Sequence, residues 1–235
     1  EIFFDDDTLT DDIDRVEKLA IAMGELGFGK PGFPLTWSCN AKANVPRKTL
    51  EIMKANGCRL LLVGYESGNQ QILHNIKKGM RIEVAERFTR DCHELGIKIH
   101  GTFILGLPGE TPETIRQTVE FAKELDVFSL QVSLAAPYPG TELYEQAKLN
   151  GWFVKKDKTD LIEGDGLQQS TLEYPGVSKE FIFEEVERFY RQYYLRPKPI
   201  LRIIKTMLED KDVCVRRLRE GYEFFKSMAQ RRSDL

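Results

Sequence analysis

Short apolar segments alternate with helical patterns from residue 2 to residue 136, and this alternation constrains the fold most strongly. The segments rich in strand-forming residues lie at 2–5, 35–41, 59–65, 98–105 and 128–136. Helical patterns fill the gaps: one is expected to be capped by Thr10, one spans 46–56, one ends at Gly96 and one begins at Thr111. Alternating strands and helices predict βαβ units in a parallel sheet with right-handed crossovers.

Polar residues occupy alternate positions in three of the expected strands, within segments 36–40, 98–102 and 129–133. A parallel sheet covered by helices on both faces is apolar throughout, so this pattern argues against a doubly wound sheet. One polar face per strand instead predicts a curved sheet with a wet concave side and helices outside. We therefore expect an α/β fold, a partial (β/α) TIM-like barrel of parallel strands, with its chemistry at the C-terminal ends of the strands.

The strand–helix alternation stops near Trp152, which predicts three regions. Residues 1–151 are expected to form the partial barrel, 152–177 a loop or linker, and 178–235 a C-terminal helical region with helices at 178–195, 200–208 and 213–228. Aromatic and cationic side chains mix in that last region. They predict packing on the barrel, with a peripheral membrane contact as the alternative.

Composition narrows the choice of partners and compartment. The net charge of −3 provides no basic field, so we expect no nucleic-acid partner. No apolar stretch approaches the roughly 20 residues of a membrane span. The four cysteines fit neither a zinc nor a disulfide spacing and are expected to be buried, which indicates a reducing, cytoplasmic setting; they are Cys39, Cys58, Cys92 and Cys214.

Small, polar or Gly/Pro-rich residues follow every expected strand, at 5–8, 40–42, 64–68, 106–111 and 136–141. Glycines let the backbone approach a ligand closely, and carboxylates accept hydrogen bonds from amines and hydroxyls. Five such clusters on one rim predict a site that wraps an extended, polar, partly charged ligand.

These clusters belong to motifs that occur together in one order, namely FFDDDTLT, WSCNAK, GYESGNQQIL followed by IKKGM, GTFILGLPGET and PYPGTELY. The set resembles the radical S-adenosylmethionine (SAM) superfamily over residues 1–150. It is most similar to the class with a cobalamin domain, which includes the anaerobic magnesium-protoporphyrin monomethyl ester oxidative cyclases and the hopanoid-biosynthesis radical SAM proteins. The segments WSCNAKANV and LLLVGYESGNQQIL favour the hopanoid-associated members.

The resemblance implies three cofactors: SAM, a [4Fe–4S] cluster and cobalamin. Such proteins hold the cluster with a CxxxCxxC loop, cleave SAM reductively to a 5′-deoxyadenosyl radical, and receive the electron from a donor such as flavodoxin or ferredoxin. This sequence has no CxxxCxxC loop. Because its Asp-rich strand resembles the second strand of the family, the cluster ligands are expected upstream of Glu1, and the chain alone is expected to be inactive.

The resemblance also implies the residues of the site. Asp6 and Asp7 would meet the SAM amino group, Lys42 would lie where relatives often carry an arginine, and Glu66 would contact the ribose. The full set of expected cofactor contacts is Asp6, Asp7, Thr8, Ser38, Asn40, Lys42, Glu66, Ser67, Gly106, Pro108 and Glu110. The expected substrate contacts are His100, Gln131 and Tyr138.

The implied function is SAM-dependent radical chemistry on an apolar polycyclic or isoprenoid-derived substrate of hopanoid or tetrapyrrole type, a small or lipid-like molecule. Methyl transfer, rearrangement and cyclisation stay open. Two alternatives remain: a non-catalytic domain that binds a SAM-like ligand, and a magnesium-dependent barrel enzyme that uses the carboxylates of 5–7. Asp11 and Asp12 are expected only in the first turn of a helix, and an exposed sheet edge predicts self-association.

Overall fold

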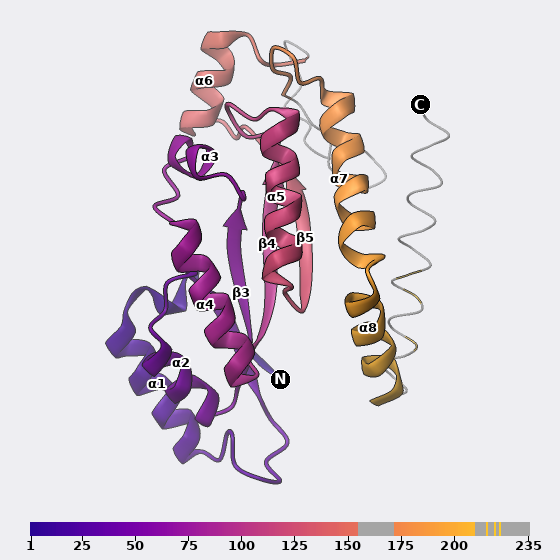
Figure 1. The fold of residues 1–235 in the computed structure, drawn as a ribbon. Helices are drawn as coiled ribbons and strands as arrows, with labels where there is room; N and C mark the ends of the chain where they lie inside the picture. The colour runs from indigo at the N-terminus through magenta and orange to yellow at the C-terminus, as the bar shows by residue number, and fades with distance from the viewer. Residues whose placement is uncertain (155–171, 210–214, 216–218, 220, 222–235) are drawn as a thin grey trace. The chain divides into compact units, whose positions relative to one another are not determined.

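The computed structural model describes residues 1–154 and 172–209, together with Val215, Arg219 and Gly221. Its sheet has five strands in sequential order, each parallel to its neighbours. The strands are β1 (Ile2–Phe4), β2 (Trp37–Ala41), β3 (Cys58–Glu66), β4 (Lys98–Leu105) and β5 (Ser129–Leu134) (Figure 1). All five strands expected from the sequence are present, with boundaries moved by two residues or fewer.

Four helices connect the strands: α1 (Ile13–Glu25), α2 (Arg47–Ala55), α4 (Ile82–Leu95) and α5 (Pro112–Leu125). A 3₁₀ turn, η1 (Leu9–Asp11), precedes α1, the short α3 (Gln70–Asn75) precedes α4, and α6 (Glu142–Asn150) follows β5. The chain divides into two compact units, 1–186 and 187–235. Helix α7 (Lys179–Tyr194) begins in the first unit and ends in the second, and α8 (Pro197–Glu209) lies in the second. The helix expected at 213–228 falls largely outside the described residues.

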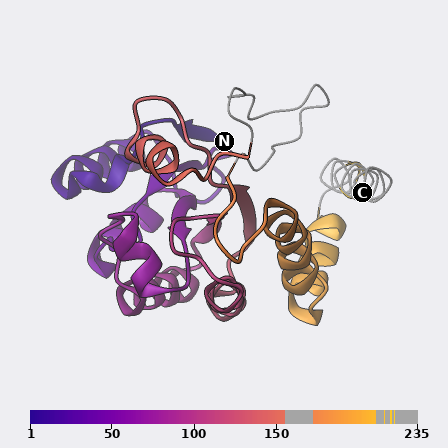
Figure 2. The ribbon, with the colours of Figure 1, turned by 90° about the horizontal axis from the view of Figure 1, so that it is seen from above.

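The helices α1, α2, α4 and α5 follow one another along a single face of the sheet (Figures 1 and 2). Each connection joins adjacent strands, so crossovers of one hand place every helix on the same side. Burial in β4 alternates accordingly, with Ile99 and Phe103 buried against the helices and His100 and Thr102 half-exposed. The expected partial barrel, with helices outside and a polar concave face, is confirmed.

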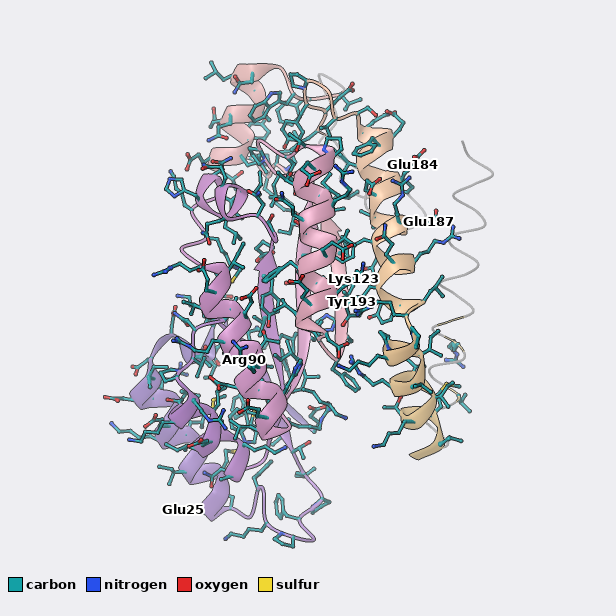
Figure 3. The ribbon with its side chains drawn as sticks, viewed as in Figure 1. Glu25, Arg90, Lys123, Glu184, Glu187 and Tyr193 are labelled. Carbon is teal, nitrogen blue, oxygen red and sulfur yellow. The ribbon has the colours of Figure 1, made fainter. Side chains whose placement is uncertain are left out.

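Aromatic side chains fill the layer between the sheet and the helices. Tyr65 of β3 is fully buried, its hydroxyl is 2.6 Å from Thr89 Oγ1 on α4, and its ring stacks on Phe103 of β4. Its hydroxyl therefore keeps a partner inside an apolar layer, as buried tyrosines require. Charged side chains such as Glu25 and Arg90 project to the solvent side of the helices (Figure 3).

Thr10 does not cap the first helix, contrary to the expectation from the sequence. It is buried, and its hydroxyl accepts a hydrogen bond from the backbone N–H of Lys42 at 3.1 Å. Asp12 is the cap of α1, because its carboxylate accepts from the N–H of Arg15 at 2.9 Å. Asp11 lies in η1 and forms an ion pair with Lys42, so it also serves the loop rather than the helix dipole.

The bounds of α3 and the presence of α6 were not expected from the sequence. Each is short, so the apolar periodicity that signals a longer helix is absent. Their caps carry the signal instead: Asn69 accepts from the N–H of Ile72, and Thr141 accepts from the N–H of Tyr144. Among the described residues, no helix is long and apolar enough to cross a membrane.

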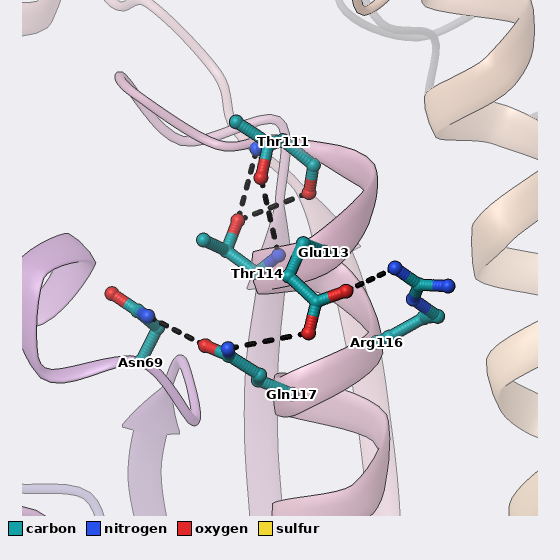
Figure 4. A network of polar contacts seen from close by, with 6 residues as sticks. All are labelled: Asn69, Thr111, Glu113, Thr114, Arg116 and Gln117. Atoms are coloured by element: carbon teal, nitrogen blue, oxygen red, sulfur yellow. Dashed lines mark hydrogen bonds and ion pairs between the residues drawn. The ribbon is translucent and has the colours of Figure 1, made fainter.

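Helix α5 begins with the cap expected at Thr111, and this cap supports a prediction (Figure 4). The Thr111 hydroxyl accepts from the N–H of Thr114, and the Thr114 hydroxyl accepts in return from the N–H of Thr111. Thr111→Ala should lower the free energy of unfolding by about 1 kcal/mol, measured by urea denaturation, because one terminal N–H loses its acceptor. Thr111→Ser keeps the hydroxyl and should unfold at the wild-type urea concentration. Equal stability of all three proteins would show that the cap contributes nothing.

Candidate functional site

The carboxyl ends of β1 to β4 surround a cavity of about 660 Å³. Four segments form most of its wall: Asp7 and Thr8 after β1, residues 40–44 after β2, the end of β3, and loop 76–81 between α3 and α4. Thr102 of β4 completes it on the concave face. The volume is within the range of about 300–1,000 Å³ that is usual for pockets binding cofactors and small ligands.

Hydrogen bonds hold the first two loops of this rim together. The Asn40 side chain donates to the backbone carbonyl of Asp6 at 2.8 Å. Two contacts hold Lys42: its backbone N–H donates to the Thr10 hydroxyl, and its ammonium forms an ion pair with Asp11. The loops after β1 and β2 therefore form one wall, on which Asn40 and Lys42 both face the cavity.

Glu66 reaches the cavity from a strained position at the end of β3. Its φ of 62° is in the left-handed region, which costs a non-glycine residue of order 1–3 kcal/mol. The strain coincides with a bulge, where the register moves from Gly64 opposite Thr102 to Glu66 opposite Phe103. Glu66 lies on the same face of β3 as Leu62 and Gly64, which also line the cavity, and the Lys78 ammonium lies 2.7 Å from its carboxylate.

Gly64 leaves the space that this ion pair occupies. A Cβ atom at residue 64 would lie 2.4 Å from Oε1 of Glu66 and 2.9 Å from Nζ of Lys78. Any larger residue would displace the pair from its place over β3. The pair is also partly shielded, since the side chains of Glu66 and Lys78 are 15% and 32% exposed, so solvent screens it less than a surface ion pair.

The two residues after Glu66 have a structural role rather than a place in the cavity. Ser67 is fully buried, and its hydroxyl lies 3.1 Å from Thr118 Oγ1 on α5. A Cβ atom at Gly68 would lie 2.7 Å from the carbonyl oxygen of Gln117, so glycine permits the close approach of α5. In the segment Glu-Ser-Gly, only Glu66 lines the cavity.

Glu110 is buried within the loop that follows β4. Its Oε2 accepts from the N–H of Gly106 at 2.6 Å and of Leu107 at 3.0 Å, while Oε1 has no hydrogen-bond partner. Burial raises the pKa of this carboxyl to about 7, against the two backbone donors, which favour its charged form. Tyr174 donates to the Gly106 carbonyl at 2.7 Å and fixes the same loop from the other side.

The structure divides the residues expected from the sequence into two groups. Those that line the cavity are Asp7, Thr8, Asn40, Lys42 and Glu66. Those outside its lining are Asp6, Ser38, Ser67, Gly106, Pro108, Glu110, His100, Gln131 and Tyr138.

Several residues of the second group have other partners. Asp6 pairs with Arg15 at 3.0 Å, and Ser38 is buried. The carbonyl of Pro108 accepts from the side chain of Asn75 at 3.3 Å. The side chain of Tyr138 is exposed.

Sequence reasoning missed the cations of loop 76–81. The loop brings Lys77, Lys78 and Arg81 to the cavity, and Lys78 is the partner of Glu66. The segment IKKGM was part of the motif set, but nothing in its residues indicates how far the two lysines reach. The signal that could have found Lys78 is the need of a partly buried carboxylate for a cation.

The described residues contain no group of three His, Cys, Asp or Glu side chains that could hold a metal ion. Cys39, Cys58 and Cys92 are buried in the core, as expected, and Cys214 lies outside the described residues. Burial raises the pKa of the Cys39 thiol to about 12, whereas a metal or cluster ligand must be a thiolate. The described part of the chain therefore does not fit a [4Fe–4S] cluster, and the carboxylates of 5–7 form no magnesium site there.

Comparison with known proteins identifies the family. The model of the radical SAM superfamily matches residues 1–122. The chain therefore belongs to the radical SAM superfamily, whose members are enzymes.

Curated relatives are considerably longer than this chain. An uncharacterized methyltransferase of Pyrococcus horikoshii is 30% identical over 94% of this chain and 46% of its own length. Cytidylyl-2-hydroxyethylphosphonate methyltransferase of Streptomyces wedmorensis is 27% identical over 83% of this chain and 37% of its own length. Bacteriochlorophyllide d C-12(1)-methyltransferase of Chlorobaculum tepidum is 30% identical over 53% of this chain and 28% of its own length. The chain thus spans less than half of each.

Solved structures share the fold. The radical SAM methyltransferase TsrM from Kitasatospora setae, with cobalamin and a [4Fe–4S] cluster bound, aligns with a TM-score of 0.63 at 19% identity over 80% of this chain and 43% of its own. Coproporphyrinogen III oxidase HemN from Escherichia coli aligns with a TM-score of 0.53 at 16% identity, over 77% of this chain and 37% of its own. Both likenesses support the partial radical SAM barrel.

The raised pKa of Glu110 predicts a pH-dependent stability. Its folded-state pKa of about 7 exceeds the ordinary value of 4.5, so its contribution is full below pH 4.5 and is lost as the pH rises through 7. Glu110→Gln keeps an acceptor for Gly106 and Leu107 but cannot ionise. The free energy of unfolding of the wild type relative to this variant should fall by up to about 3 kcal/mol between pH 4.5 and 7.

Urea denaturation at several pH values measures this difference. A constant difference between the wild type and Glu110→Gln across the range would mean that Glu110 ionises normally.

Proposed function

We propose that this chain forms the SAM-binding part of a radical SAM enzyme, and that the whole protein transfers methyl groups with the help of cobalamin. Membership of the superfamily supports the first part. The second is supported by the three curated relatives described above, all named methyltransferases, and by TsrM, a methyltransferase with bound cobalamin. Methyl transfer is therefore favoured over rearrangement or cyclisation, which the sequence left open.

The single observation that carries the assignment to SAM is the strained Glu66 with its partner Lys78. Strained backbone persists where the surrounding structure holds it, and it is concentrated at ligand sites. SAM carries a carboxylate, an amino group and two ribose hydroxyls. The cavity offers both cations and carboxylates for these groups, in a volume of about 660 Å³, and the residues present therefore fit SAM.

Each charged residue of the cavity has a role in this proposal. Glu66 would accept hydrogen bonds from the ribose hydroxyls, and Asp7 would receive the amino group. Lys42 and Lys78 would attract the carboxylate, as single-point cations rather than as the two-pronged clamp that arginine provides. When bound and reductively cleaved, SAM supplies a 5′-deoxyadenosyl radical. The residues of this chain would bind and orient SAM.

The substrate, electron donor and location extend the proposal. We retain a polycyclic substrate of hopanoid or tetrapyrrole type, and the bacteriochlorophyllide methyltransferase supports the tetrapyrrole choice. A flavodoxin or ferredoxin would supply the electron, and the protein would act in the cytoplasm.

Substituting Glu66 tests the SAM site directly. Glu66→Gln should weaken SAM binding roughly 10- to 100-fold, because hydrogen bonds to a charged acceptor contribute about 1.5–3 kcal/mol each. Isothermal titration of SAM into the whole chain measures the dissociation constant without any need for the cluster.

Glu113 on α5 provides the matched control, since it lies outside the cavity lining and pairs with Arg116. Glu113→Gln should bind SAM as tightly as the wild type does. Equal affinity of the wild type and Glu66→Gln would remove Glu66 from the site, and no SAM binding by the wild type would refute the proposal for this chain. Tight binding by a complete protein that never cleaves SAM would instead favour a non-catalytic SAM-like binding domain.

A further inference from the structure

The concave face of the sheet continues from the cavity across β4 and β5. In the parallel register, His100 lies opposite Ser129 and Thr102 lies opposite Gln131. Alternate residues of a strand share a face, so His100 lies on the same side as Thr102, which lines the cavity. The surface formed by His100, Thr102, Ser129, Gln131 and Ser133, here called the polar face, therefore adjoins the proposed SAM site.

Hydrogen bonds organise the polar face in pairs. Nδ1 of His100 is 2.8 Å from Oγ of Ser129, and the Gln131 side chain donates to Oγ of Ser133 at 3.3 Å. The first bond uses Nδ1 and leaves Nε2 of His100 as the ring nitrogen that can meet a ligand. Gln131 is exposed, and its carbonyl oxygen is an acceptor beside these donors.

The chemistry of this face is neutral. Partial burial lowers the pKa of His100 and so favours its uncharged imidazole near pH 7. None of the alternate positions on β4 and β5 is a carboxylate. The cation on this side, Lys98, has its ammonium 4.5 Å from the centroid of the Phe128 ring. The polar face therefore offers imidazole, hydroxyl and amide groups rather than a net charge, with Ile104 and Leu62 as apolar neighbours on the same side.

A sheet face that a barrel closes over is ordinarily filled by apolar side chains. Polar side chains in that position lose their hydrogen bonds to water, and the loss is offset only when other groups replace those bonds. The internal pairs satisfy part of this need, and a ligand with its own donors and acceptors satisfies the rest. A purely hydrocarbon ligand would leave Nε2 of His100 and the Gln131 amide without partners.

We propose that the polar face is the subsite for the methyl acceptor, and that it takes a neutral carbonyl, hydroxyl or amide group through His100 and Gln131. This inference rests on the proposed function and narrows it. The polycyclic substrate must carry such a group on the side that meets β4 and β5, which excludes an unfunctionalised hydrocarbon. Thr102, shared by the cavity and the polar face, marks where the acceptor would approach SAM.

Three small probes, each a benzene ring with one substituent, test which chemical class of ligand the polar face binds. Benzamide is neutral and polar, benzoate is anionic, and toluene is apolar. Each is titrated into the whole chain carrying ¹⁵N-labelled histidine and glutamine side chains, and the NMR signals of His100 and Gln131 are followed. Benzamide should shift both signals in a saturable way, and benzoate and toluene should shift them less. Larger shifts with benzoate or toluene, or none with benzamide, would overturn the inference.

Substitution at an exposed position keeps the test independent of folding. Gln131→Leu should weaken benzamide binding about fivefold, the effect of losing one neutral hydrogen bond, and should leave SAM affinity unchanged. The control Gln146→Leu, on α6, should change neither. Unaltered benzamide affinity in Gln131→Leu would overturn the assignment of Gln131.

SAM titration of the same samples separates the two proposals. If the wild type binds benzamide at His100 and Gln131 but does not bind SAM, the proposed function fails, and the polar face is a neutral binding site that is not tied to methyl transfer. If SAM binds while benzamide leaves both signals unchanged, the proposed function stands and the subsite is refuted.

Discussion

In the described part of the chain, the helices that connect the strands lie on one face of the five-stranded sheet, because every connection runs from one strand to its immediate neighbour. The apolar side chains gather on that covered face, where Tyr65, Phe103 and Phe121 pack together. The other face carries half-exposed residues, among them His100 and Thr102, and the cavity at the carboxyl ends of the strands. Both proposed binding surfaces follow from this one-sided arrangement, since a doubly wound sheet would bury them under a second layer of helices.

Bonds between segments that are distant in sequence tie together the loops at the carboxyl ends of the strands. Asn40 connects the loops after β1 and β2, Asn75 connects α3 to the loop after β4, and Tyr174 fixes that loop through the Gly106 carbonyl. Such cross-links hold charged groups in place before a ligand arrives, which reduces the entropy lost on binding. The strained Glu66 backbone is held at the end of β3 by the packing of Ser67 and Gly68 against α5.

Sequence reasoning predicted the fold well, because its signals are local. Alternating polarity, a Thr-Pro start and a glycine stop define strands and helices over a few residues each, as Thr111 and Gly96 show. The start of α1 was wrong because Thr10 and Asp12 are both good caps, and only the contact with Lys42 decides between them.

The candidate site was predicted less completely, because its geometry depends on tertiary contacts. The sequence predicted Glu66 at the site, but its left-handed backbone at the bulge after Gly64 and its ion pair with Lys78 arise only in the folded chain. Ser67 and Glu110 belong to the same motifs as the cavity residues, yet both are buried and outside its lining. Lys78 was missed because its approach to Glu66 requires the fold of the short helix α3.

A crystal structure of the chain with bound SAM is the most direct test of the central claim, that the strained Glu66 and its partner Lys78 belong to a SAM site. The account predicts SAM in the cavity at the ends of β1 to β4, with the ribose hydroxyls on the Glu66 carboxylate and the SAM carboxylate toward Lys78 or Lys42. SAM bound elsewhere, or bound in the cavity without contact to Glu66, would contradict it.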